Sequence, residues 1–236
     1  MPISQAIILA AGRGERMRPL TDSCPKPLLV VRGKPLIVWH LENLNSAGVR
    51  HVVINTAWLE EQFASTLGDG SAWGLRISYS HEGARFGGAL ETAGGIATAL
   101  PLLDTSQPFW VLAGDVYVPE FEFAAAALAG LAHIYLVPNP EHNPQGDFGL
   151  SAQGLALDGQ EGPRWTYSTI GLYRAALFVG IALGQKATLA PLLRAAMRCS
   201  QVSAEIYRGS WTDVGTPARL EELNSTTAKA GLCSES

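Results

Sequence analysis

Short apolar runs alternate with segments of helical spacing throughout the first half of the chain, and this alternation limits the possible folds more than any other property. The first apolar run, residues 5–10, ends in small residues and glycine, as expected of a buried parallel strand that leads into a tight loop. After Pro35, apolar residues recur at helical spacing, and Gly48 stands where a helix would be capped. The alternation predicts right-handed βαβ units and a largely parallel sheet covered on both faces.

The other predicted elements follow from the same periodicities. Further strands are expected at residues 52–55, 75–79, 109–113, 134–137, 148–150, 165–173 and 202–207. Helices are expected at residues 59–67, 92–100, 124–129, 189–198 and 217–228, the last with Thr216 as its N-cap. The second half lacks a regular alternation of strands and helices, so a mixed arrangement is expected there.

The composition is that of a chain with a well-packed core. Of the 236 residues, 47% are hydrophobic and only 16% are charged, which leaves ample apolar material for burial. No stretch has the composition of a linker. We therefore expect one domain over residues 1–230, followed by a short tail at residues 231–236.

Charge and cysteine content exclude several classes of partner. The net charge is −4 and Lys and Arg form no long run, so nucleic acid is not an expected partner. Cys24, Cys199 and Cys233 form no CxxC pair, which argues against a disulfide framework or a structural zinc site and favours a cytoplasmic location. The chain opens without a secretory signal, and Arg174 interrupts one of two apolar stretches, so no membrane contact is expected.

The most informative segment is a loop rich in glycine and alanine that follows the first strand. It reads LAAGRGERMRPLT at residues 9–21 and PKP at residues 25–27. Small residues let the backbone approach a ligand and present N–H groups to an anion, while Arg16 and Lys26 add positive charge, a combination that suits a triphosphate. The segment matches neither the P-loop nor the three-glycine dinucleotide turn, and taken alone it is equally compatible with an ordinary turn.

Together with the residues that follow it, this loop resembles a known family. The pattern LAAGxGxRMxPLTxxxPKPLxxVxGxPLI, complete at residues 9–37, is similar to the opening of the sugar 1-phosphate nucleotidyltransferases. The similarity continues with LETAGG at residues 90–95, Gly-Asp at 114–115, Asn-Pro at 139–140, Gly-Asp-Phe at 146–148 and WTDVGT at 211–216. It implies a Rossmann-like three-layer α/β/α fold with a mainly parallel mixed sheet, a nucleotide-binding part at about residues 1–115 and a sugar-binding part at about 116–215.

The resemblance also implies partners and roles for the matched residues. The partners are a nucleoside triphosphate and a sugar 1-phosphate, and the expected assembly is a monomer or a small homo-oligomer. Arg16 is implied to bind the β- and γ-phosphates and Lys26 the region of the α-phosphate, and both are implied to act in catalysis with Asp115. The implied nucleotide-binding residues are Leu9, Ala11, Gly12, Gly14, Arg16, Glu82, Thr92, Gly94 and Asp115. The implied sugar-binding residues are Asn139, Asp147, Arg164, Ser168 and Thr169.

Two aspartates are the predicted ligands of a Mg²⁺ cofactor. Transfer of a nucleotidyl group between two anionic substrates depends on positioning and charge neutralisation, and Mg²⁺ needs only one or two carboxylates beside its waters and phosphates. Asp115 directly follows an apolar strand, where open α/β sheets bind their ligands. Asp213 lies in a turn before the last helix, and the resemblance implies that both bind the metal. Taken alone, Asp115 could cap a turn and Asp213 could stabilise the following helix.

Local matches narrow the implied substrates. NTAWL at residues 55–59, Tyr-Ser at 167–168 and LAPLLR at 189–194 are similar to the branch of the family that joins UTP to N-acetylmuramate 1-phosphate in cell-wall recycling. Thr169 stands where the family usually has glycine, and a longer loop at residues 84–89 leaves the base-contacting register open. The lactyl carboxylate of this sugar would favour a neighbouring cation. Arg164 is our hypothesis for that cation, although a solvated arginine is the simpler interpretation.

Three alternatives stay open at this point. A mannose or glucose 1-phosphate nucleotidyltransferase that uses GTP or dTTP would share the loop and both aspartates. A choline-phosphate cytidylyltransferase would need an aromatic box, for which Trp58, Trp73 and Trp165 are available. A nucleotide-sugar sensor would use the same fold without turnover, and the retained acidic and basic residues argue against it.

Overall fold

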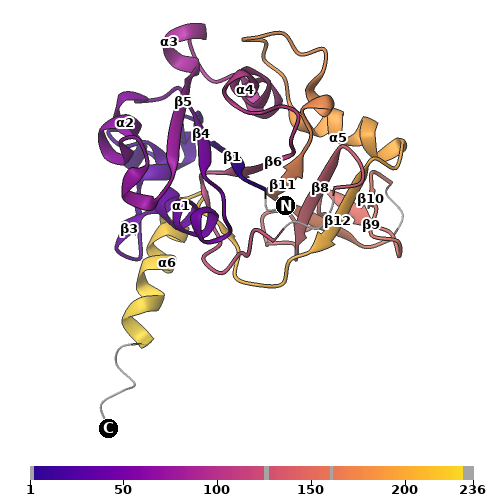
Figure 1. Ribbon diagram of the computed structural model, residues 1–236. Helices are drawn as coiled ribbons and strands as arrows, with labels where there is room; N and C mark the ends of the chain where they lie inside the picture. Colours follow the sequence, from indigo (N-terminus) through magenta and orange to yellow (C-terminus); the bar gives the residue numbers. More distant parts are fainter. Residues whose placement is uncertain (1–2, 125–127, 160–161, 231–236) are drawn as a thin grey trace.

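The protein is built around one mixed β-sheet (Figure 1). The structure, a computed structural model, describes residues 3–124, 128–159 and 162–230. The strands of the sheet are β1 (Gln5–Leu9), β4 (His51–Thr56), β5 (Arg76–His81), β6 (Phe109–Ala113), β8 (Ala132–Val137), β9 (Phe148–Leu150), β10 (Ala156–Leu157), β11 (Arg164–Tyr173) and β12 (Val202–Ile206). Their order is β10-β9-β11-β6-β1-β4-β5, with β8 beside β11 and β12 beside β8.

The direction of the strands changes across the sheet. β6, β1, β4 and β5 run parallel, and Ile7 at the centre pairs with Val53 on one side and Val111 on the other. β11 runs antiparallel to β6, β8 and β9, and β12 runs parallel to β8. The parallel first half and the mixed second half confirm the predicted α/β class.

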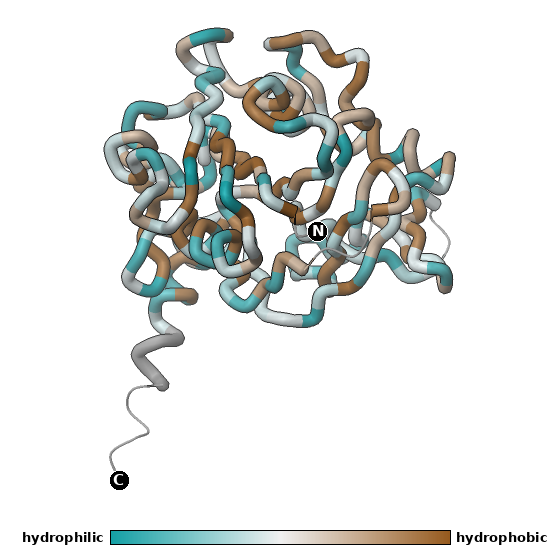
Figure 2. The backbone as a smooth tube through the Cα atoms, in the orientation of Figure 1, coloured by the Kyte–Doolittle hydropathy of each residue, from teal (hydrophilic) through white to brown (hydrophobic). Residues whose placement is uncertain are grey.

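Helices cover both faces of the sheet (Figures 1 and 2). They are α1 (Leu36–Ser46), α2 (Glu61–Leu67), α3 (Glu82–Phe86), α4 (Glu91–Ala99), α5 (Leu189–Arg198) and α6 (Pro217–Ala230). Successive side chains of a strand point to opposite faces. Ala6 and Ile8 of β1 accordingly pack into a core with α1 and α2, whereas Ile7 packs into a second core with α4 and α5. All three side chains are fully buried, and the result is the predicted three-layer arrangement.

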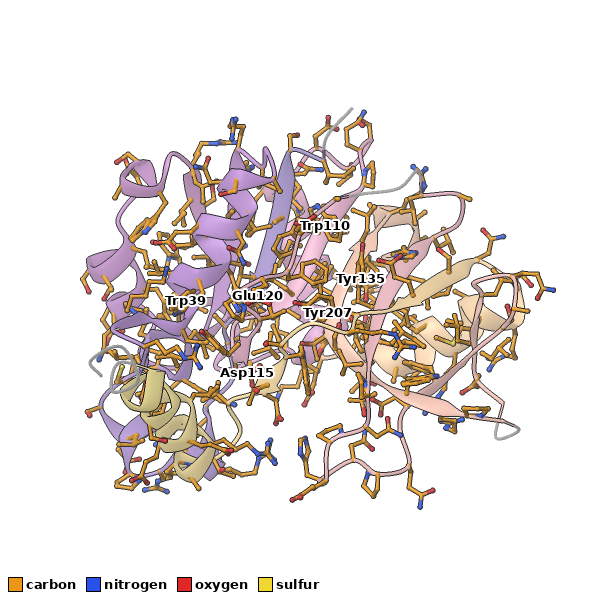
Figure 3. The ribbon with its side chains drawn as sticks, turned by 90° about the horizontal axis from the view of Figure 1, so that it is seen from below. Trp39, Trp110, Asp115, Glu120, Tyr135 and Tyr207 are labelled. Carbon is orange, nitrogen blue, oxygen red and sulfur yellow. The ribbon has the colours of Figure 1, made fainter. Side chains whose placement is uncertain are left out.

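An aromatic cluster joins the two halves of the sheet. The ring centroids of Trp110 on β6 and Tyr135 on β8 are 6.0 Å apart, and those of Phe121 and Tyr207 are 5.2 Å apart. Figure 3 shows Trp110, Tyr135 and Tyr207 gathered between the parallel and the mixed half. Trp110 is fully buried, and the ring of Phe121 is packed edge-on against it. The cluster therefore fixes the segment that follows β6 relative to the sheet.

The predicted ends of two helices are confirmed. Gly48 has φ 90° and follows α1, and the N–H of Val49 donates to the carbonyl of Leu44 at 3.0 Å, which is the long hydrogen bond of a Schellman motif. α6 begins directly after Thr216, whose hydroxyl oxygen accepts a hydrogen bond from the backbone N–H of Arg219 at 3.4 Å. Local sequence signals thus decided where these helices stop and start.

Two local predictions were wrong. The helix expected at residues 124–129 is absent at its described ends, because Ala124, Leu128 and Ala129 are not helical, and residues 125–127 lie outside the described residues. Phe121 and Phe123, just before this segment, are buried in the core, and such tertiary contacts outweigh the helix propensity of alanine, although it is the highest of all residues. The short helix α3 was not predicted, since its residues were assigned to a loop.

Short elements complete the fold. Two-residue strands form two ribbons, β2 (Val30–Val31) with β3 (Lys34–Pro35) and β7 (Val116–Tyr117) with β13 (Thr212–Asp213). Short 3₁₀ turns lie at Glu15–Met17, Leu20–Asp22, Lys26–Leu28, Ser71–Trp73, Leu100–Leu102 and Ala175–Phe178. Within the described ranges, no helix has the length and apolar character needed to cross a membrane.

Candidate active site

A cavity of about 780 Å³ opens at the carboxyl ends of β1 and β6. The predicted site residues on its wall are Leu9, Ala11, Gly12, Gly14, Arg16, Lys26, Glu82, Thr92, Asp115, Asp147 and Thr169. Other wall residues include Ala10, Asn55, Glu91, Phe148, Tyr167, Thr188, Leu189, Ala190, Leu193 and Arg194. The wall thus combines the glycine-rich loop with segments of the second half of the chain.

The loop after β1 is held in a defined conformation. The N–H of Ala10 donates to Oδ1 of Asn55 at 2.7 Å. Gly14 has φ 69°, and a Cβ added there would lie 3.0 Å from Cγ2 of Thr21 and 3.3 Å from Cβ of Lys26. The left-handed backbone conformation therefore favours glycine at this position, and a side chain there would also be tightly packed. The hydroxyl of Thr21 also donates to the carbonyl of Gly14 at 2.9 Å.

Two predicted cations lie on the wall beside this loop. Nζ of Lys26 is 2.7 Å from Oδ2 of Asp115, and the side chains are 9% and 40% exposed, respectively. The ammonium is thus buried against a carboxylate that still faces the cavity. Arg16 is exposed on the wall and makes no hydrogen bond or ion pair with another described residue. Its guanidinium is consequently available to an anion.

The ribbon of β7 and β13 brings Asp213 next to Asp115. The two strands pair antiparallel, and the N–H of Val214 donates to the backbone carbonyl of Asp115 at 2.9 Å. Figure 3 shows Asp115 beside the segment that leads into α6. Oδ2 of Asp213 accepts a hydrogen bond from Arg219 at 2.6 Å, and its Oδ1 lies 3.2 Å from Nε2 of His142. The two predicted metal ligands are therefore neighbours, although nearly a hundred residues separate them in the sequence.

The carboxylates of Asp115 and Asp213 suit Mg²⁺ better than zinc. Across residues 3–124, 128–159 and 162–230 there is no cluster of three or more His, Cys, Asp or Glu side chains that could hold a metal ion. Two carboxylates suit Mg²⁺, which takes its remaining ligands from water and phosphate, and do not suit structural zinc. Asp115 and Asp213 are each neutralised by a neighbouring cation, so a divalent ion bound between them would compete with Lys26 and Arg219.

A buried hydrogen-bond network lies behind the cavity wall. Glu82 is fully buried, and its two carboxylate oxygens accept from Nδ2 of Asn55 at 2.7 Å and from the N–H of Leu90 at 2.8 Å. Burial raises the pKa of Glu82, and the hydrogen bonds from Leu90 and Asn55 oppose this rise. Since Asn55 also accepts from Ala10, the network ties together the loop after β1, the end of β4 and the starts of α3 and α4.

Asp147 is the carboxylate that the mixed half contributes to the wall. Its Oδ2 accepts from the N–H of Tyr167 at 2.8 Å and from the side-chain amide of Asn143 at 3.2 Å, which leaves Oδ1 unoccupied by the described residues. Asn139 is exposed and is not among the described wall residues. Its amide donates to the carbonyl of Arg164 at 3.0 Å, so it supports the loop that carries Asp147.

A β-bulge in β11 determines where Ser168 and Thr169 point. The register against β8 shifts between Tyr167 and Gly171, and Thr169 has φ 65°. Ser168 is fully buried and donates to the carbonyl of Tyr135 at 2.8 Å, whereas Thr169 reaches the cavity wall. A β-branched residue in the left-handed region costs roughly 1–2 kcal/mol. This backbone conformation gives a physical reason for the glycine that the family usually has at position 169.

Five predicted site residues are not among the described wall residues, namely Gly94, Asn139, Arg164, Ser168 and Asp213. The guanidinium of Arg164 donates to the carbonyls of Gly159 and Asp147, so it ties β11 to neighbouring loops and is not a free cation, contrary to our hypothesis. Gly94 is buried within α4. A Cβ added there would clash with the carbonyl oxygen of Gln185, so this glycine allows close packing of a loop against the helix.

Sequence reasoning missed two contributions to the wall. One is Asn55, a polar residue at the end of a buried strand, which was noted only as part of a local match. The other is α5, whose start and inner face supply Thr188, Leu189, Ala190, Leu193 and Arg194. The helix itself was predicted with the correct bounds. The face that meets the cavity depends on tertiary packing, and the family match at residues 189–194 was the only available signal.

Among the described residues, Trp58, Trp73 and Trp165 do not form an aromatic box for a quaternary ammonium. Arg13 covers the ring of Trp58, with its guanidinium carbon 3.8 Å from the ring centroid, and the indole N–H donates to the carbonyl of Thr21 at 2.9 Å. Neither Trp58 nor Trp73 nor Trp165 belongs to the described wall. The structure therefore offers no support for the choline-phosphate alternative.

Comparison with known proteins gives a consistent result. The family model described as "Nucleotidyl transferase" matches residues 5–156. An N-acetylmuramate alpha-1-phosphate uridylyltransferase of Neisseria meningitidis is 53% identical, with 94% of this chain and 97% of the relative covered. A glucose-1-phosphate thymidylyltransferase of Actinoplanes is 29% identical over 91% of this chain and 75% of the relative. Among solved structures, the inositol-1-phosphate CTP transferase from T. maritima covers 95% of this chain and 96% of its own, with a TM-score of 0.74 and 18% identity, which supports the fold alone.

These matches agree with the fold and with the residues gathered around the cavity. The chain belongs to the nucleotidyl transferase family. Within that family it is a sugar 1-phosphate nucleotidyltransferase, as its sequence predicted.

Proposed function

We propose that the protein transfers the uridylyl group of UTP to N-acetylmuramate 1-phosphate, giving UDP-N-acetylmuramate and pyrophosphate. The observation that carries the proposal is the 53% identity to the Neisseria enzyme, which extends over nearly the full length of both chains. The 29% identical thymidylyltransferase keeps a glucose 1-phosphate activity as the second candidate. We further propose a role in peptidoglycan recycling and a cytoplasmic location.

The glycine-rich loop and its two cations suit the triphosphate. In the reaction, an oxygen of the sugar phosphate attacks the α-phosphorus of UTP in line, and pyrophosphate leaves on the opposite side. Arg16, which has no partner among the described residues, would bind the β- and γ-phosphates and favour their departure. Lys26 is held by Asp115 at the wall and would neutralise charge near the α-phosphate.

Asp115 and Asp213 would hold the magnesium ion that we propose as cofactor. The N–H of Val214, next to Asp213, donates to the backbone carbonyl of Asp115, and the two carboxylates are paired with Lys26 and Arg219. A bound Mg²⁺ would neutralise phosphate charge and orient the reacting groups. Lys26 and Arg219 would then be free to contact the anionic substrates. We therefore propose that both cations belong to the substrate-binding site.

The remaining wall residues divide between base and sugar. The network of Glu82, Asn55 and Ala10 would fix the segments around the base, together with Thr92 at the start of α4. Asp147 would accept hydrogen bonds from sugar hydroxyls through its free Oδ1. We accordingly propose a nucleotide-binding part at about residues 1–115 and a sugar-binding part at about 116–215 within one domain.

Pyrophosphate release across a matrix of substrates tests the proposal. UTP, dTTP and GTP are each combined with N-acetylmuramate, glucose, mannose and N-acetylglucosamine 1-phosphates, with and without Mg²⁺. We expect the largest kcat/KM for UTP with N-acetylmuramate 1-phosphate and no turnover in the presence of a chelator. A higher kcat/KM for glucose 1-phosphate with dTTP would instead favour the second candidate.

A further inference from the structure

Arg194 is the cation of the cavity wall that lies on a different element from the glycine-rich loop. The positively charged residues among the described wall residues are Arg16, Lys26 and Arg194. The first two belong to the loop after β1. Arg194 is on α5, which packs against β10 and β12 at the far side of the sheet from β4 and β5 (Figure 1). Its guanidinium would therefore contact a different part of a bound ligand from the part contacted by Arg16 and Lys26.

The guanidinium of Arg194 is anchored on one edge only. Its Nε is 2.9 Å from Oδ1 of Asp158, just after β10. The terminal nitrogens Nη1 and Nη2 make no hydrogen bond with another described residue, and the side chain is 45% exposed. An arginine held through Nε presents its two terminal N–H groups as a rigid fork, which matches the two oxygens of a carboxylate.

The neighbourhood of Arg194 also suits a sugar. Leu193 and Leu189 of the same helix are buried and line the wall with it, as does Phe148 of β9. Asp147, next to Phe148, offers the carboxylate oxygen that would bind hydroxyl groups. Apolar side chains with a few oriented polar groups are typical of sites for small organic ligands.

We propose that Arg194 is the specificity-determining residue for an anionic substituent on the sugar, and that it binds the lactyl carboxylate of N-acetylmuramate 1-phosphate. The inference rests on the proposed function, since it names a subsite for that substrate. Arg194 thus replaces Arg164 as the proposed sugar-binding cation, because the guanidinium of Arg164 already donates to backbone carbonyls.

The test compares two substrates that differ only in the lactyl group, namely N-acetylmuramate 1-phosphate and N-acetylglucosamine 1-phosphate. Arg194→Gln removes the charge with little loss of length, and Arg194→Ala is a second variant. Arg198→Gln is the matched control, because Arg198 lies on the same helix, also faces Asp158 at 3.6 Å, and does not belong to the described wall. Circular dichroism verifies that each variant is folded.

We expect both Arg194 variants to lower kcat/KM for the muramyl substrate by about tenfold to a hundredfold, mainly through KM, as for the loss of a charge-assisted hydrogen bond. The N-acetylglucosaminyl substrate should change by at most about threefold, and the control variant should change neither by more than about twofold. Equal losses on both substrates, or an unchanged muramyl KM, would overturn the proposal.

Direct binding separates this inference from the proposed function. If the wild-type protein turns over neither substrate, the proposed function fails, and isothermal titration with the two sugar phosphates decides the role of Arg194. Tighter binding of the muramyl compound to wild-type than to Arg194→Gln, without such a difference for the other sugar, supports the subsite. Equal affinities, or no binding of the muramyl compound to the wild-type protein, overturn it.

Discussion

Replacing Glu82 by glutamine should destabilise the protein strongly, although the two side chains have nearly the same shape. Both oxygens of Glu82 accept hydrogen bonds, at 2.7 Å from Asn55 and at 2.8 Å from the N–H of Leu90. Asn55 cannot reverse its amide, because its Oδ1 already accepts from Ala10. Glutamine supplies one acceptor and one NH₂ group, so two donors would face each other in a fully buried site. Leaving one buried donor unsatisfied costs about 1–3 kcal/mol, and the added donor raises the expected loss to roughly 2–4 kcal/mol.

Urea unfolding followed by circular dichroism measures this loss as a shift of the midpoint at constant slope. Glu61→Gln is the matched control, because Glu61 is an exposed residue of α2 that has no hydrogen bond or ion pair with another described residue. The free energy of unfolding of the Glu61→Gln variant should stay within about 0.5 kcal/mol of the wild-type value. The nucleotidyltransferase activity of Glu82→Gln should also fall, since the network positions Ala10 and the start of α4.

Adding Asn55→Asp to Glu82→Gln should restore much of the lost stability. In Asn55→Asp with Glu82→Gln, the aspartate accepts from Ala10 and from the new glutamine amide, while the glutamine oxygen accepts from Leu90. Each hydrogen bond of the wild-type network then has a counterpart, and the net charge is unchanged. We expect the double variant to recover at least half of the stability lost in Glu82→Gln. A double variant that is no more stable than the single one would refute the deduced direction of these hydrogen bonds.

Three further predictions concern the cavity and its surroundings. Asp115→Asn should leave the protein folded and lower kcat at least about a hundredfold, equivalent to roughly 2.7 kcal/mol, with a higher Mg²⁺ requirement in steady-state assays; a folded variant with near-normal kcat would remove Asp115 from the site. Arg16→Ala should raise the KM for UTP about tenfold without changing the urea midpoint, whereas Arg18→Ala, exposed and outside the described wall, should leave the KM unchanged. Burial lowers the pKa of His40 from 6.5 to about 4, so the unfolded chain binds the proton more readily, and stability should fall by about 3 kcal/mol as the pH drops from 6.5 through 4. His40→Leu should flatten this part of the unfolding profile, and an unchanged profile would count against the assignment.

Most of the fold was predictable because its determinants are local. The apolar runs of β1, β4 and β6 are short and bounded by small or polar residues, so periodicity identified them. Gly48 and Thr216 mark helix ends through backbone conformation and capping, which depend on few neighbours. The helix predicted at residues 124–129 was wrong at its described ends, because the burial of Phe121 and Phe123 outweighs the helix propensity of the alanines.

The site was predictable where a residue type meets a backbone requirement, and not where the role depends on tertiary packing. The conformation of Gly14 is set within the loop itself, and the pattern of the loop predicted that Gly14 and Lys26 belong to one site. Arg164 and Arg194 are both arginines of the second half, and nothing in their local sequence says which one faces the cavity. That choice is made by the carbonyls that use up the donors of Arg164 and by the packing of α5 against β10 and β12.

The convergence of Asp115 and Asp213 depends on a small apolar core more than on the two-residue ribbon that joins them. An isolated pair of such short strands is not stable in water. Tyr117 and Val214, which closely follow the two aspartates, are buried together with Met17 of the glycine-rich loop in a core separate from the two that cover the sheet. Val214 and Met17 are fully buried, so displacing either would expose apolar surface at a cost of about 1.5–3 kcal/mol. The same core therefore holds the loop and the segments of both aspartates in one arrangement, and this explains how Asp115 and Asp213, distant in the sequence, become neighbours.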